Sequence, residues 1–514
     1  MPTQHKDSLS SHRHGEPLAR RVLADRHRHV RPARIGTPAA LPRVLFVTTE
    51  MTDFVKTGGL GDVAAALPRA LRSMLDIRVL LPAYPSVLDK ARAIVWEGRT
   101  EAYAGMPASE IGRLQTEDGL TIYVLRQPAL FERPGSPYVS PVGADWSDNA
   151  LRFATLSMAA AQIAAGEAHL AWRPELLHLN DWPTALAAAY AQWTRRPVPS
   201  VLTLHNLAYQ GYFPLALRSL LGIPPRAPEV EAHGQLSFLR AGIAHADHLS
   251  TVSESYAREI TEGAHGMGLH LLLQKKAAQG RLTGILNGID DSWNPSTDPA
   301  LPAPFTAHRT EARADTAQRV RVELGLRESR GPLFAMVARL VHQKGVDMVC
   351  EAAPQIVAAG GQLAMIGCGD PGMEREVARL ARRFPGQVAA HIGFREALAR
   401  RMFAGSDFLL MPSRFEPCGL SQMYAQAYGS LPIAYATGGL LDTVEDGVTG
   451  LLFHEPSVAG LRSALQRAFR IHEEPRLLAA MRRAAMLQRH DWGRSARAYA
   501  SLYASAMPRR VAAA

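Results

Sequence analysis

The segment Val44–Asp62, VLFVTTEMTDFVKTGGLGD, decides the fold of this chain. Its apolar run Val44–Val47 predicts a buried strand, and the amphipathic stretch Asp62–Met74 predicts the helix after it. The glycine-rich loop Lys56–Asp62 joins the two. Glycines let backbone N–H groups approach a phosphate or a sugar, and a helix start adds partial positive charge. The loop is neither a Walker A motif nor a GxGxxG fingerprint, and a tight turn that needs positive φ stays an alternative.

The same alternation of apolar runs and amphipathic stretches continues along the chain. Further strands are predicted at Ile77–Leu81, Thr121–Leu125, Leu176–Leu179, Val201–Leu204 and Leu249–Val252. After the Pro-rich stretch Asn294–Pro304, strands are predicted at Leu333–Val337, Gln362–Ile366, Val388–Ile392, Phe408–Met411 and Leu431–Tyr435. Helices are predicted there at Asp347–Ala359, Glu374–Arg383, Leu420–Tyr428 and Leu461–Phe469. This pattern predicts an α/β fold with two Rossmann-like units in tandem, each built on a parallel sheet.

We expect four parts along the chain. They are a basic tail over 1–41, an N-terminal unit over 42–300, a C-terminal unit over 301–490 and a last segment over 491–514 that holds a helix. The tail carries eight of the Lys and Arg residues against three Asp and Glu, so it holds about half of the net charge of +10. It has no apolar core of a secretory signal, and its composition favours a disordered tail, with a transit peptide as the alternative.

Composition narrows the class of protein. With 47% hydrophobic and 20% charged residues, the chain is typical of a globular protein with a large core. No uninterrupted apolar run of about 18 residues is present, so we expect no membrane-spanning helix. The three cysteines, Cys350, Cys368 and Cys418, are too scattered for a disulfide framework or a zinc site and favour a cytoplasmic location. No basic motif with interleaved aromatics indicates nucleic-acid binding.

Polar residues follow two predicted strands of the N-terminal unit. Asp181 lies at the end of the first, in HLNDW, and His205 lies at the end of the second. Because ligands of open parallel sheets bind beyond the carboxyl ends of the strands, these side chains are expected to face one site. A carboxylate and an imidazole there can hold sugar hydroxyls or stabilise developing positive charge. Local capping and a satisfied core contact are the alternatives.

The C-terminal unit carries cations and a carboxylate at its own strand ends. Arg339 and Lys344 follow the strand Leu333–Val337, and a guanidinium fork with an ammonium group suits a diphosphate. Glu416 follows Phe408–Met411 behind Phe and Pro, where a carboxylate without a partner is costly. A glycine pair, Gly438-Gly439, follows the next strand and can offer backbone amides. A solvated surface pair and ordinary turns are the alternatives.

The sequence also lacks the usual metal motifs. There is no Asp-x-Asp, the paired carboxylate with which many nucleotide-sugar enzymes hold Mg²⁺ or Mn²⁺, and no HExxH. We therefore expect no metal and no other cofactor. If the chain expels a nucleoside diphosphate, side-chain cations and helix amides must carry its charge.

These motifs together closely resemble those of bacterial glycogen synthases and plant starch synthases. The matching segments, from about Leu41 to Leu502, are Lys56–Val63 (KTGGLGDV), His178–Trp182 (HLNDW), Thr203–Gly211 (TLHNLAYQG), Asn287–Asp290 (NGID), Arg339–Gly345 (RLVHQKG), Ser413–Leu420 (SRFEPCGL) and Thr437–Leu440 (TGGL). The resemblance implies a GT-B fold, in which two Rossmann-like domains face each other across a cleft and a C-terminal helix, here Trp492–Ala506, packs back on the first.

The resemblance also implies roles for individual residues. The catalytic set would be Glu416, Asp181, His205, Arg339 and Lys344, with Glu416 holding the transferred glucose and the two cations binding the diphosphate. The donor would be bound by Lys56, Gly58, Gly59, Asn287, Arg339, Lys344, Cys418, Gly419, Thr437, Gly438 and Gly439. The implied reaction transfers glucose from ADP-glucose to the non-reducing end of an α-1,4-glucan, glycogen or maltodextrin, with retention of configuration.

Other readings stay open at this stage. Within the fold they are a plastid-type starch synthase, a UDP-glucose-using relative and an α-glucan phosphorylase; outside it, a hydride-transferring Rossmann enzyme and a catalytically silent glucan-binding protein. Many retaining relatives carry a second Glu eight residues after the first, where this chain has Tyr424, so ribose binding must use other groups. The sequence leaves the oligomeric state open.

Overall fold

The computed structural model describes residues 41–91 and 93–507; the predicted tail lies outside them, except for Leu41. The N-terminal lobe is built on a nine-stranded sheet in the order β12-β11-β7-β6-β1-β2-β5-β4-β3. Its strands, in that order, are Leu282–Gly284, His248–Thr251, Ser200–Leu204, Leu176–Asn180, Arg43–Val47, Asp76–Pro82, Thr121–Arg126, Ser109–Gln115 and Val95–Thr100. From β12 to β5 neighbouring strands pair in parallel, whereas β4 and β3 are antiparallel.

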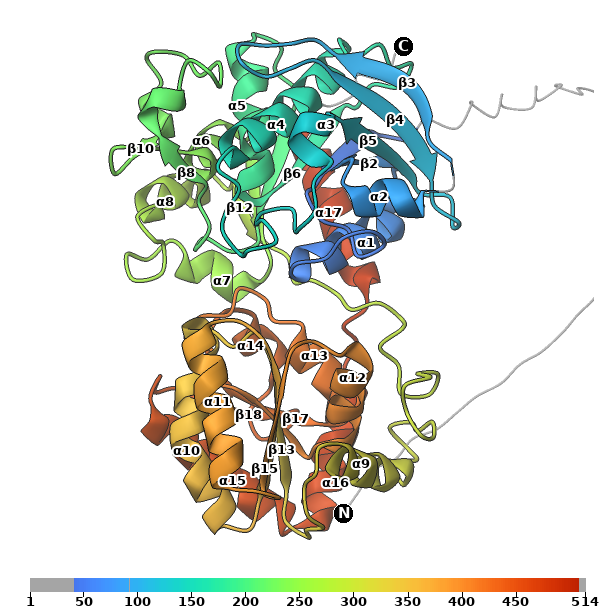
Figure 1. Cartoon of the computed structure of the whole chain (residues 1–514), viewed down its shortest axis with the longest axis vertical. Helices are drawn as coiled ribbons and strands as arrows, with labels where there is room; N and C mark the ends of the chain where they lie inside the picture. The colour runs from blue at the N-terminus through green and yellow to red at the C-terminus, as the bar shows by residue number, and fades with distance from the viewer. Residues whose placement is uncertain (1–40, 92, 508–514) are drawn as a thin grey trace, which may run out of the picture. The chain divides into compact units, whose positions relative to one another are not determined.

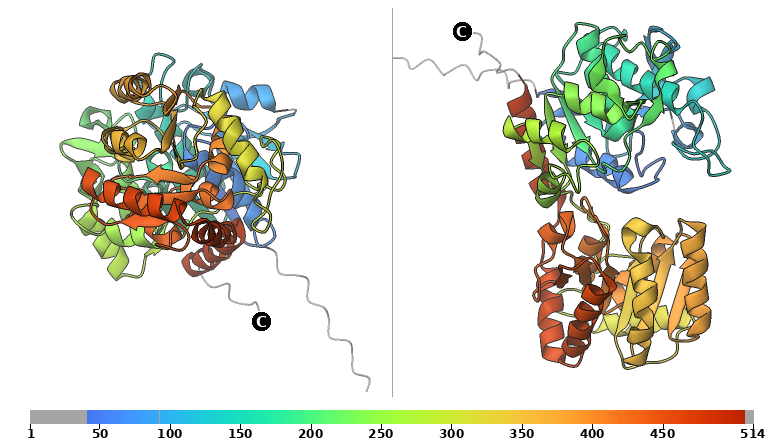
Figure 2. Two further views of the ribbon diagram at one scale, coloured as in Figure 1. Left: turned by 90° about the horizontal axis from the view of Figure 1, so that it is seen from below. Right: turned by 90° about the vertical axis from the view of Figure 1, so that its left-hand side faces the viewer.

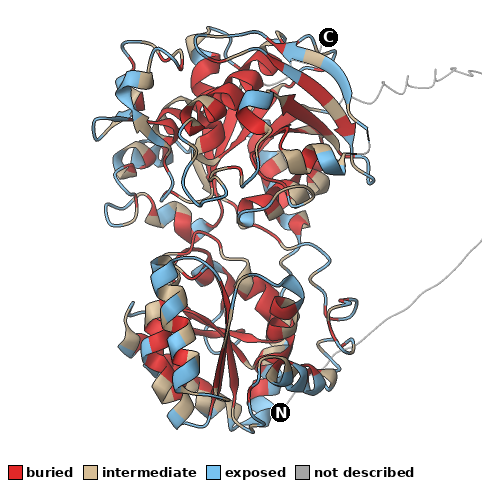
Figure 3. Cartoon of the chain, in the orientation of Figure 1, coloured by how far each residue is buried: buried red, intermediate tan, exposed pale blue. Residues whose placement is uncertain are grey.

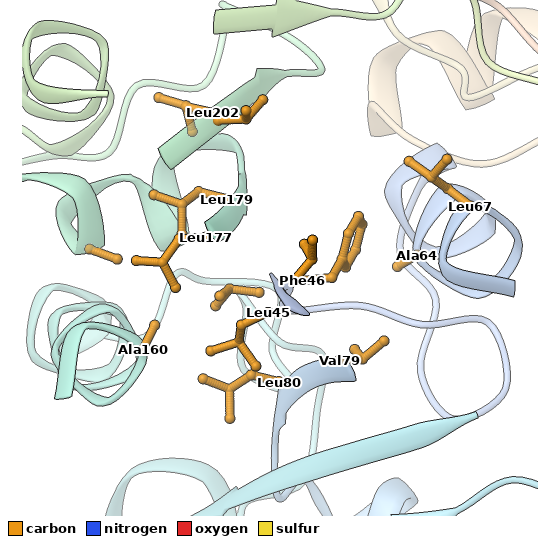
Figure 4. Packing of buried hydrophobic residues seen from close by; sticks show 14 of the residues in the cluster. Leu45, Phe46, Ala64, Leu67, Val79, Leu80, Ala160, Leu177, Leu179 and Leu202 are labelled. Carbon is orange, nitrogen blue, oxygen red and sulfur yellow. The ribbon is translucent and has the colours of Figure 1, made fainter. Parts of the chain in front are cut away.

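Helices cover both faces of the parallel part of this sheet. The helices of this lobe are α1 (Gly59–Leu71), α2 (Pro85–Lys90), α3 (Pro128–Phe131), α4 (Asn149–Ala165), α5 (Asp181–Trp193), α6 (Phe238–His245), α7 (Glu254–Glu259) and α8 (His270–Ala278). Successive strand side chains point to opposite faces. Figure 4 shows Phe46 pointing toward Ala64 and Leu67 of α1, while Leu45 lies on the side of Ala160 of α4. Because β1 is buried on both faces, its sequence is a continuous apolar run.

The six-stranded sheet of the C-terminal lobe is parallel throughout. Its order is β15-β14-β13-β16-β17-β18, that is Val388–Ile392, Gln362–Gly367, Leu333–Val337, Phe408–Met411, Leu431–Tyr435 and Leu451–Phe453. Along β13, Phe334 and Met336 belong to one core and Leu333 and Ala335 to the other. Two helical layers therefore sandwich this sheet, and Figure 3 shows its strands buried.

The helices of the C-terminal lobe are α9 (Ala312–Glu323), α10 (Val346–Ala358), α11 (Pro371–Arg383), α12 (Glu396–Gly405), α13 (Ser421–Ala427), α14 (Gly438–Thr443), α15 (Val458–His472) and α16 (Pro475–Met486). In Figure 1, α10, α11 and α15 lie on one face of the six-stranded sheet, and α9, α12 and α13 lie on the other. Loops at the carboxyl ends of the strands carry the polar residues singled out by the sequence. The largely parallel N-terminal sheet and the fully parallel C-terminal sheet confirm the predicted α/β class.

The last helix, α17 (Trp492–Ala506), has the bounds expected from the sequence and packs on the N-terminal lobe. Its tyrosines Tyr499 and Tyr503 are fully buried there, and the Tyr503 hydroxyl hydrogen-bonds Nδ1 of His178 on β6. The views of Figure 2 show this helix alongside that lobe. A contact so distant in sequence makes the N-terminal core depend on the end of the chain.

Several elements differ from the sequence-based expectation. Helix α1 begins at Gly59 and not at Asp62, and α11 begins at Pro371 and not at Glu374 because Asp370 caps the amides of Gly372 and Met373. The antiparallel strands β3 and β4 were not predicted. Neither was the small sheet of β8 (Tyr212–Pro214), β10 (Gln235–Ser237) and β9 (Glu231–Ala232). An irregular segment that includes Asn294–Pro304 separates β12 from α9.

Candidate active site

Lys344 and Glu416 form the centre of the site in the C-terminal lobe. Lys344 lies in the 3-10 turn His342–Lys344 after β13, and Glu416 lies in the loop after β16. Their side chains form an ion pair, Nζ to Oε2, in which the lysine is 17% and the glutamate 6% exposed. The Ser413 hydroxyl donates a second hydrogen bond to the same carboxylate oxygen at 2.9 Å. A buried pair with this extra donor is rigidly held.

Arg339 lies beside this pair and donates hydrogen bonds to neutral groups. The exposed guanidinium donates to Oε1 of Gln343 at 3.5 Å and to the hydroxyl of Tyr209 at 3.2 Å. Gln343 in turn donates to the carbonyl of Phe415, the residue before Glu416, at 3.2 Å. The sequence-predicted trio Arg339, Lys344 and Glu416 is thus brought together at the carboxyl ends of β13 and β16.

Asp181 stands at the junction of β6 and α5 with an unusual backbone. Its φ is +54°, a left-handed conformation that aspartate tolerates better than most residues. Its Oδ1 accepts the backbone N–H of His205 at 2.7 Å and that of Asn206 at 3.4 Å. Burial raises the pKa of Asp181 to about 7, the two amides oppose the shift and the charge of Glu50 adds to it. The carboxyl therefore titrates near neutrality.

His205 is held as a neutral imidazole. Its Nε2 lies 2.9 Å from Oδ1 of Asn180, whose Nδ2 donates to the carbonyl of Val47 at 2.9 Å. Because that amide is oriented by Val47, its oxygen must accept, which assigns the proton to Nε2 of His205. Burial lowers the pKa of His205 to about 3. Nδ1 is left as an acceptor, and Asp181 and His205 share one sheet edge as expected.

The loop that carries Lys56 is held by two acidic side chains. Lys56 Nζ donates to Oδ1 of Asp62 at 2.7 Å, and burial raises the pKa of Asp62 against the effect of this lysine. The backbone N–H groups of Thr57 and Gly58 both donate to one oxygen of Glu50, at 2.6 and 2.9 Å. Gly59 begins α1, and a Cβ there would lie 3.7 Å from Leu420 in the loop that carries Glu416.

The amides of the glycine pair already have partners. Gly438 N–H donates to Oε1 of Glu259 at 2.7 Å, and the hydroxyl of Thr437 donates to the same carboxylate at 3.1 Å. Gly439 N–H donates to the carbonyl of Glu416 at 3.0 Å. A Cβ at Gly438 would come within 2.1 Å of that carbonyl, and its φ is +46°, so glycine is required. The pair packs the loop against Glu416 as well as offering donors.

Asn287, Cys418 and Gly419 lie behind the site. Burial raises the pKa of the Cys418 thiol to about 12, so it behaves as a small apolar side chain and not as an accessible thiol. Asn287 contacts this sulfur, and among the described residues its buried Oδ1 has no hydrogen-bond partner. Gly419 has φ +71°, and a Cβ there would lie 2.3 Å from Gln422.

Some residues of the site were missed by the sequence reasoning. Glu50 follows β1 by three positions and is 4% exposed, so the strand-end argument applied to Asp181 would have indicated it. Phe394, 65% exposed just after the end of β15, was not singled out either, because a single exposed apolar side chain is common on protein surfaces. Glu259 and Tyr209 join the site only through contacts of long sequence separation.

Within 41–91 and 93–507, no three His, Cys, Asp or Glu side chains are grouped as metal ligands. In the same ranges no helix has the length and apolarity needed to span a bilayer.

Two α/β lobes with a cation–carboxylate cluster at the strand ends define a GT-B glycosyltransferase, and similarity to solved structures agrees. A sucrose-phosphate synthase from Thermosynechococcus elongatus has a TM-score of 0.57 at 17% identity over 90% of this chain and 98% of its own, which shows the fold alone. Residues 43–275 match the starch synthase catalytic domain, and residues 322–485 match glycosyl transferases group 1.

Relatives of higher sequence identity indicate the family within this class of glycosyltransferases. A glycogen synthase of Xanthomonas oryzae pv. oryzae is 62% identical over 461 residues, 90% of this chain and 91% of that protein. One from Pseudomonas fluorescens is 54% identical over 464 residues, 90% of this chain and 89% of that protein. The catalytic domain of starch synthase IV from Arabidopsis thaliana, solved with ADP and acarbose, has a TM-score of 0.79 at 31% identity, covering 91% and 99% of the two chains. The chain belongs to the starch and glycogen synthase family, whose members use a nucleotide-sugar donor and a glucan acceptor.

Proposed function

We propose that this enzyme transfers glucose from ADP-glucose to the non-reducing end of an α-1,4-glucan, glycogen or maltodextrin, with retention of the α configuration. The observation that carries the proposal is the Lys344–Glu416 pair with Arg339 beside it at the strand ends. Two cations and one carboxylate gathered at the strand ends support the proposal, because cations suit a diphosphate and a carboxylate suits sugar hydroxyls. The ADP bound by the starch synthase IV relative supports the choice of nucleotide.

Arg339 and Lys344 are proposed to bind the diphosphate. Among the described residues, the guanidinium of Arg339 donates to neutral groups, at 3.2 and 3.5 Å, so it is ready to take a charged partner. Lys344 can turn part of its hydrogen-bonding capacity from Glu416 to a phosphate oxygen, because an ammonium group has three donors. Glu416, still fixed by Ser413, then accepts hydroxyls of the transferred glucose.

Lys56 and the glycine positions are proposed to complete the donor site. Lys56, 38% exposed in its ion pair with Asp62, would assist the phosphates. The amide of Gly438 would reach the distal phosphate only if Glu259 released it. Gly59, Asn287 and Gly419 would shape the pocket.

The adenine base is proposed to stack on Phe394. This exposed ring follows β15, the neighbour of β14 in the sheet whose strand ends carry Arg339 and Glu416. Tyr424, which replaces the second glutamate of many relatives, is stacked on Trp293 at a ring-centroid distance of 3.6 Å. Its ring is committed to packing, so it is not offered to a ribose.

Transfer is proposed to pass through an oxocarbenium-like glucose. The C1–O bond lengthens, the two cations stabilise the departing diphosphate, and the acceptor 4-hydroxyl attacks from the leaving-group face. A phosphate oxygen of the leaving group takes the hydroxyl proton. The neutral imidazole of His205 avoids placing a second positive charge beside that sugar, and Asp181 offers a carboxylate to it. No metal or other cofactor is needed in this scheme. We also propose a cytoplasmic location, because the three scattered cysteines suit a reducing compartment.

The test is incorporation of labelled glucose into glycogen from ADP-glucose and from UDP-glucose, each with and without a chelator. We expect ADP-glucose to be the better donor and the chelator to have no effect. Preference for UDP-glucose, or loss of transfer with the chelator, would contradict the proposal. Release of glucose 1-phosphate from glycogen that depends on orthophosphate would indicate a phosphorylase instead.

A further inference from the structure

Glu50 is a buried carboxylate with an unusual set of donors. One of its oxygens accepts the backbone N–H groups of Thr57 and Gly58, at 2.6 and 2.9 Å. The other oxygen accepts the hydroxyl of Tyr138 at 2.7 Å. The side chain is 4% exposed, so these bonds are shielded from water. Charge-assisted bonds of this kind are roughly twice as strong as neutral ones.

Tyr138, which donates its hydroxyl to Glu50, belongs to a segment that is itself held by hydrogen bonds. The backbone carbonyl of Tyr138 accepts Asn149 Nδ2 at 2.9 Å. Arg152, fully buried on α4, donates to the Asn149 side chain at 2.7 Å and to the carbonyl of Pro137 at 2.8 Å. The ring of Tyr138 also lies 6.4 Å from that of Trp182, which follows Asp181. Through Glu50 the glycine loop is therefore connected to the rigid α4 helix.

We infer that Glu50 is a positioning residue for the donor, which fixes the loop Thr57–Gly59 so that Lys56 and the start of α1 meet the diphosphate. The inference rests on the proposed function for the identity of that ligand. Glycine has more backbone freedom to lose than any other residue, so an unsupported Gly58-Gly59 pair would sample many conformations. Two amides bonded to one carboxylate remove that freedom at the residues that follow Lys56.

A role in folding alone makes a different prediction. A residue that only stabilises the fold would change the amount of active enzyme, and so turnover, with little change in the donor KM. Loss of a residue that orders the donor loop raises the donor KM first, because the loop must then be ordered when the donor binds. The inferred role concerns the donor alone, so the acceptor KM is expected to stay unchanged.

The experiment compares Glu50→Ala, Glu50→Gln and Tyr138→Phe with the full-length chain, using ADP-glucose and glycogen. Alanine removes the acceptor of two amides, and we expect the donor KM to rise by about tenfold or more. Glutamine keeps an oxygen for both amides, and we expect it to restore the donor KM to within about threefold. Tyr138→Phe removes the hydroxyl that bonds Glu50 and Thr49 but leaves the two amide bonds of Glu50, and it is expected to give an intermediate value.

Two further measurements keep the inference falsifiable. Hydrogen exchange in the peptide that spans 52–62 is expected to accelerate in Glu50→Ala and not in the control Glu175→Gln. Glu175 likewise accepts a backbone N–H, that of Arg43 at 3.1 Å, at the amino end of β1. Unchanged exchange with an unchanged donor KM in Glu50→Ala, or a loss confined to turnover, would overturn the inference. Failure of the wild-type chain to use ADP-glucose would refute the proposed function instead, while the exchange result would still decide whether Glu50 orders the loop.

Discussion

Replacing Asp181 by asparagine should stabilise the protein at alkaline pH. The backbone of Asp181 has φ +54°, a conformation that asparagine also tolerates. The amide oxygen of asparagine can still accept the N–H groups of His205 and Asn206, which now bond to Oδ1. The substitution therefore removes a titrating carboxyl and little else. An alanine at this position would instead add backbone strain.

The size of the effect follows from the pKa of Asp181. Burial raises it from 3.8 to about 7. An acid with a raised folded-state pKa destabilises the fold once the unfolded chain ionises, so the penalty grows from about pH 3.8 and is complete above about pH 7. At about 1.4 kcal/mol per pH unit the ceiling is about 4 kcal/mol.

The assay is urea denaturation of the wild type and Asp181→Asn at pH 8 and at pH 5. We expect the variant to gain up to about 4 kcal/mol at pH 8 and less than half of that at pH 5. Asp247→Asn is a matched control, since Asp247 also accepts a backbone N–H, that of Ser200 at 2.9 Å, at the opposite end of the sheet. A gain of equal size at both pH values, or a loss at pH 8, would refute the reasoning.

Three further predictions concern catalysis, donor binding and acid stability. Arg339→Ala should lower turnover at saturating ADP-glucose by about 10²–10³-fold, and near-native turnover in the labelled-glucose assay would contradict its role. Phe394→Ala should raise the donor KM by about tenfold with little change in turnover, since one aromatic stacking contact with a base is lost; an unchanged KM would place the base elsewhere. His205 and His490 stay neutral in the fold because burial lowers their pKa values from 6.5 to about 3 and about 4. Each should therefore remove about 1.4 kcal/mol of stability per pH unit as the pH falls from 6.5 toward 4, and denaturation midpoints that stay constant over that window would contradict this.

The parallel strands could be predicted from the sequence because they are buried on both faces. Runs such as Val44–Val47 and Phe408–Met411 have no polar residue to interrupt them, and both lie within observed strands. Helix starts were harder, since Gly59 and Pro371 do not look helical by propensity. At Pro371 the signal was present in Asp370, a capping residue followed by proline, whereas just before Gly59 the backbone is held by a tertiary partner, Glu50, which accepts the N–H groups of Thr57 and Gly58.

The antiparallel edge was missed for a physical reason. Strand β3 has exposed residues at Val95 and Trp96, and its pairing with β4 shifts register between Trp96 and Gly98. Such a strand shows neither a continuous apolar run nor a clean alternation. Its place in the sheet comes from pairing with β4, which is a long-range property that no local pattern carries.

In the candidate site, too, local patterns indicated some residues, whereas contacts of long sequence separation could not be predicted. The rule that ligands bind beyond strand ends indicated Asp181, His205, Arg339, Lys344 and Glu416 without knowledge of their partners. The partners lie far away in sequence: Lys344 and Glu416 are separated by 72 positions, and Glu259 and Gly438 by 179. No spacing rule reaches across such distances, so the sequence could identify the charged groups but not what neutralises them.

That neutralisation explains how the lysines of the site are accommodated in the fold. Lys56 is paired with Asp62 and Lys344 with Glu416, while glutamates also bond the amides of Gly58 and Gly438. A buried cation without such a partner would be costly. Under the proposed function, a diphosphate would have to share or replace these carboxylates, so part of its binding energy would be spent on exchange. Arg339 is different because, among the described residues, its hydrogen bonds go to neutral groups. We therefore propose that Arg339 dominates the first capture of the donor, whereas the paired lysine contributes mainly when charge develops on the leaving group.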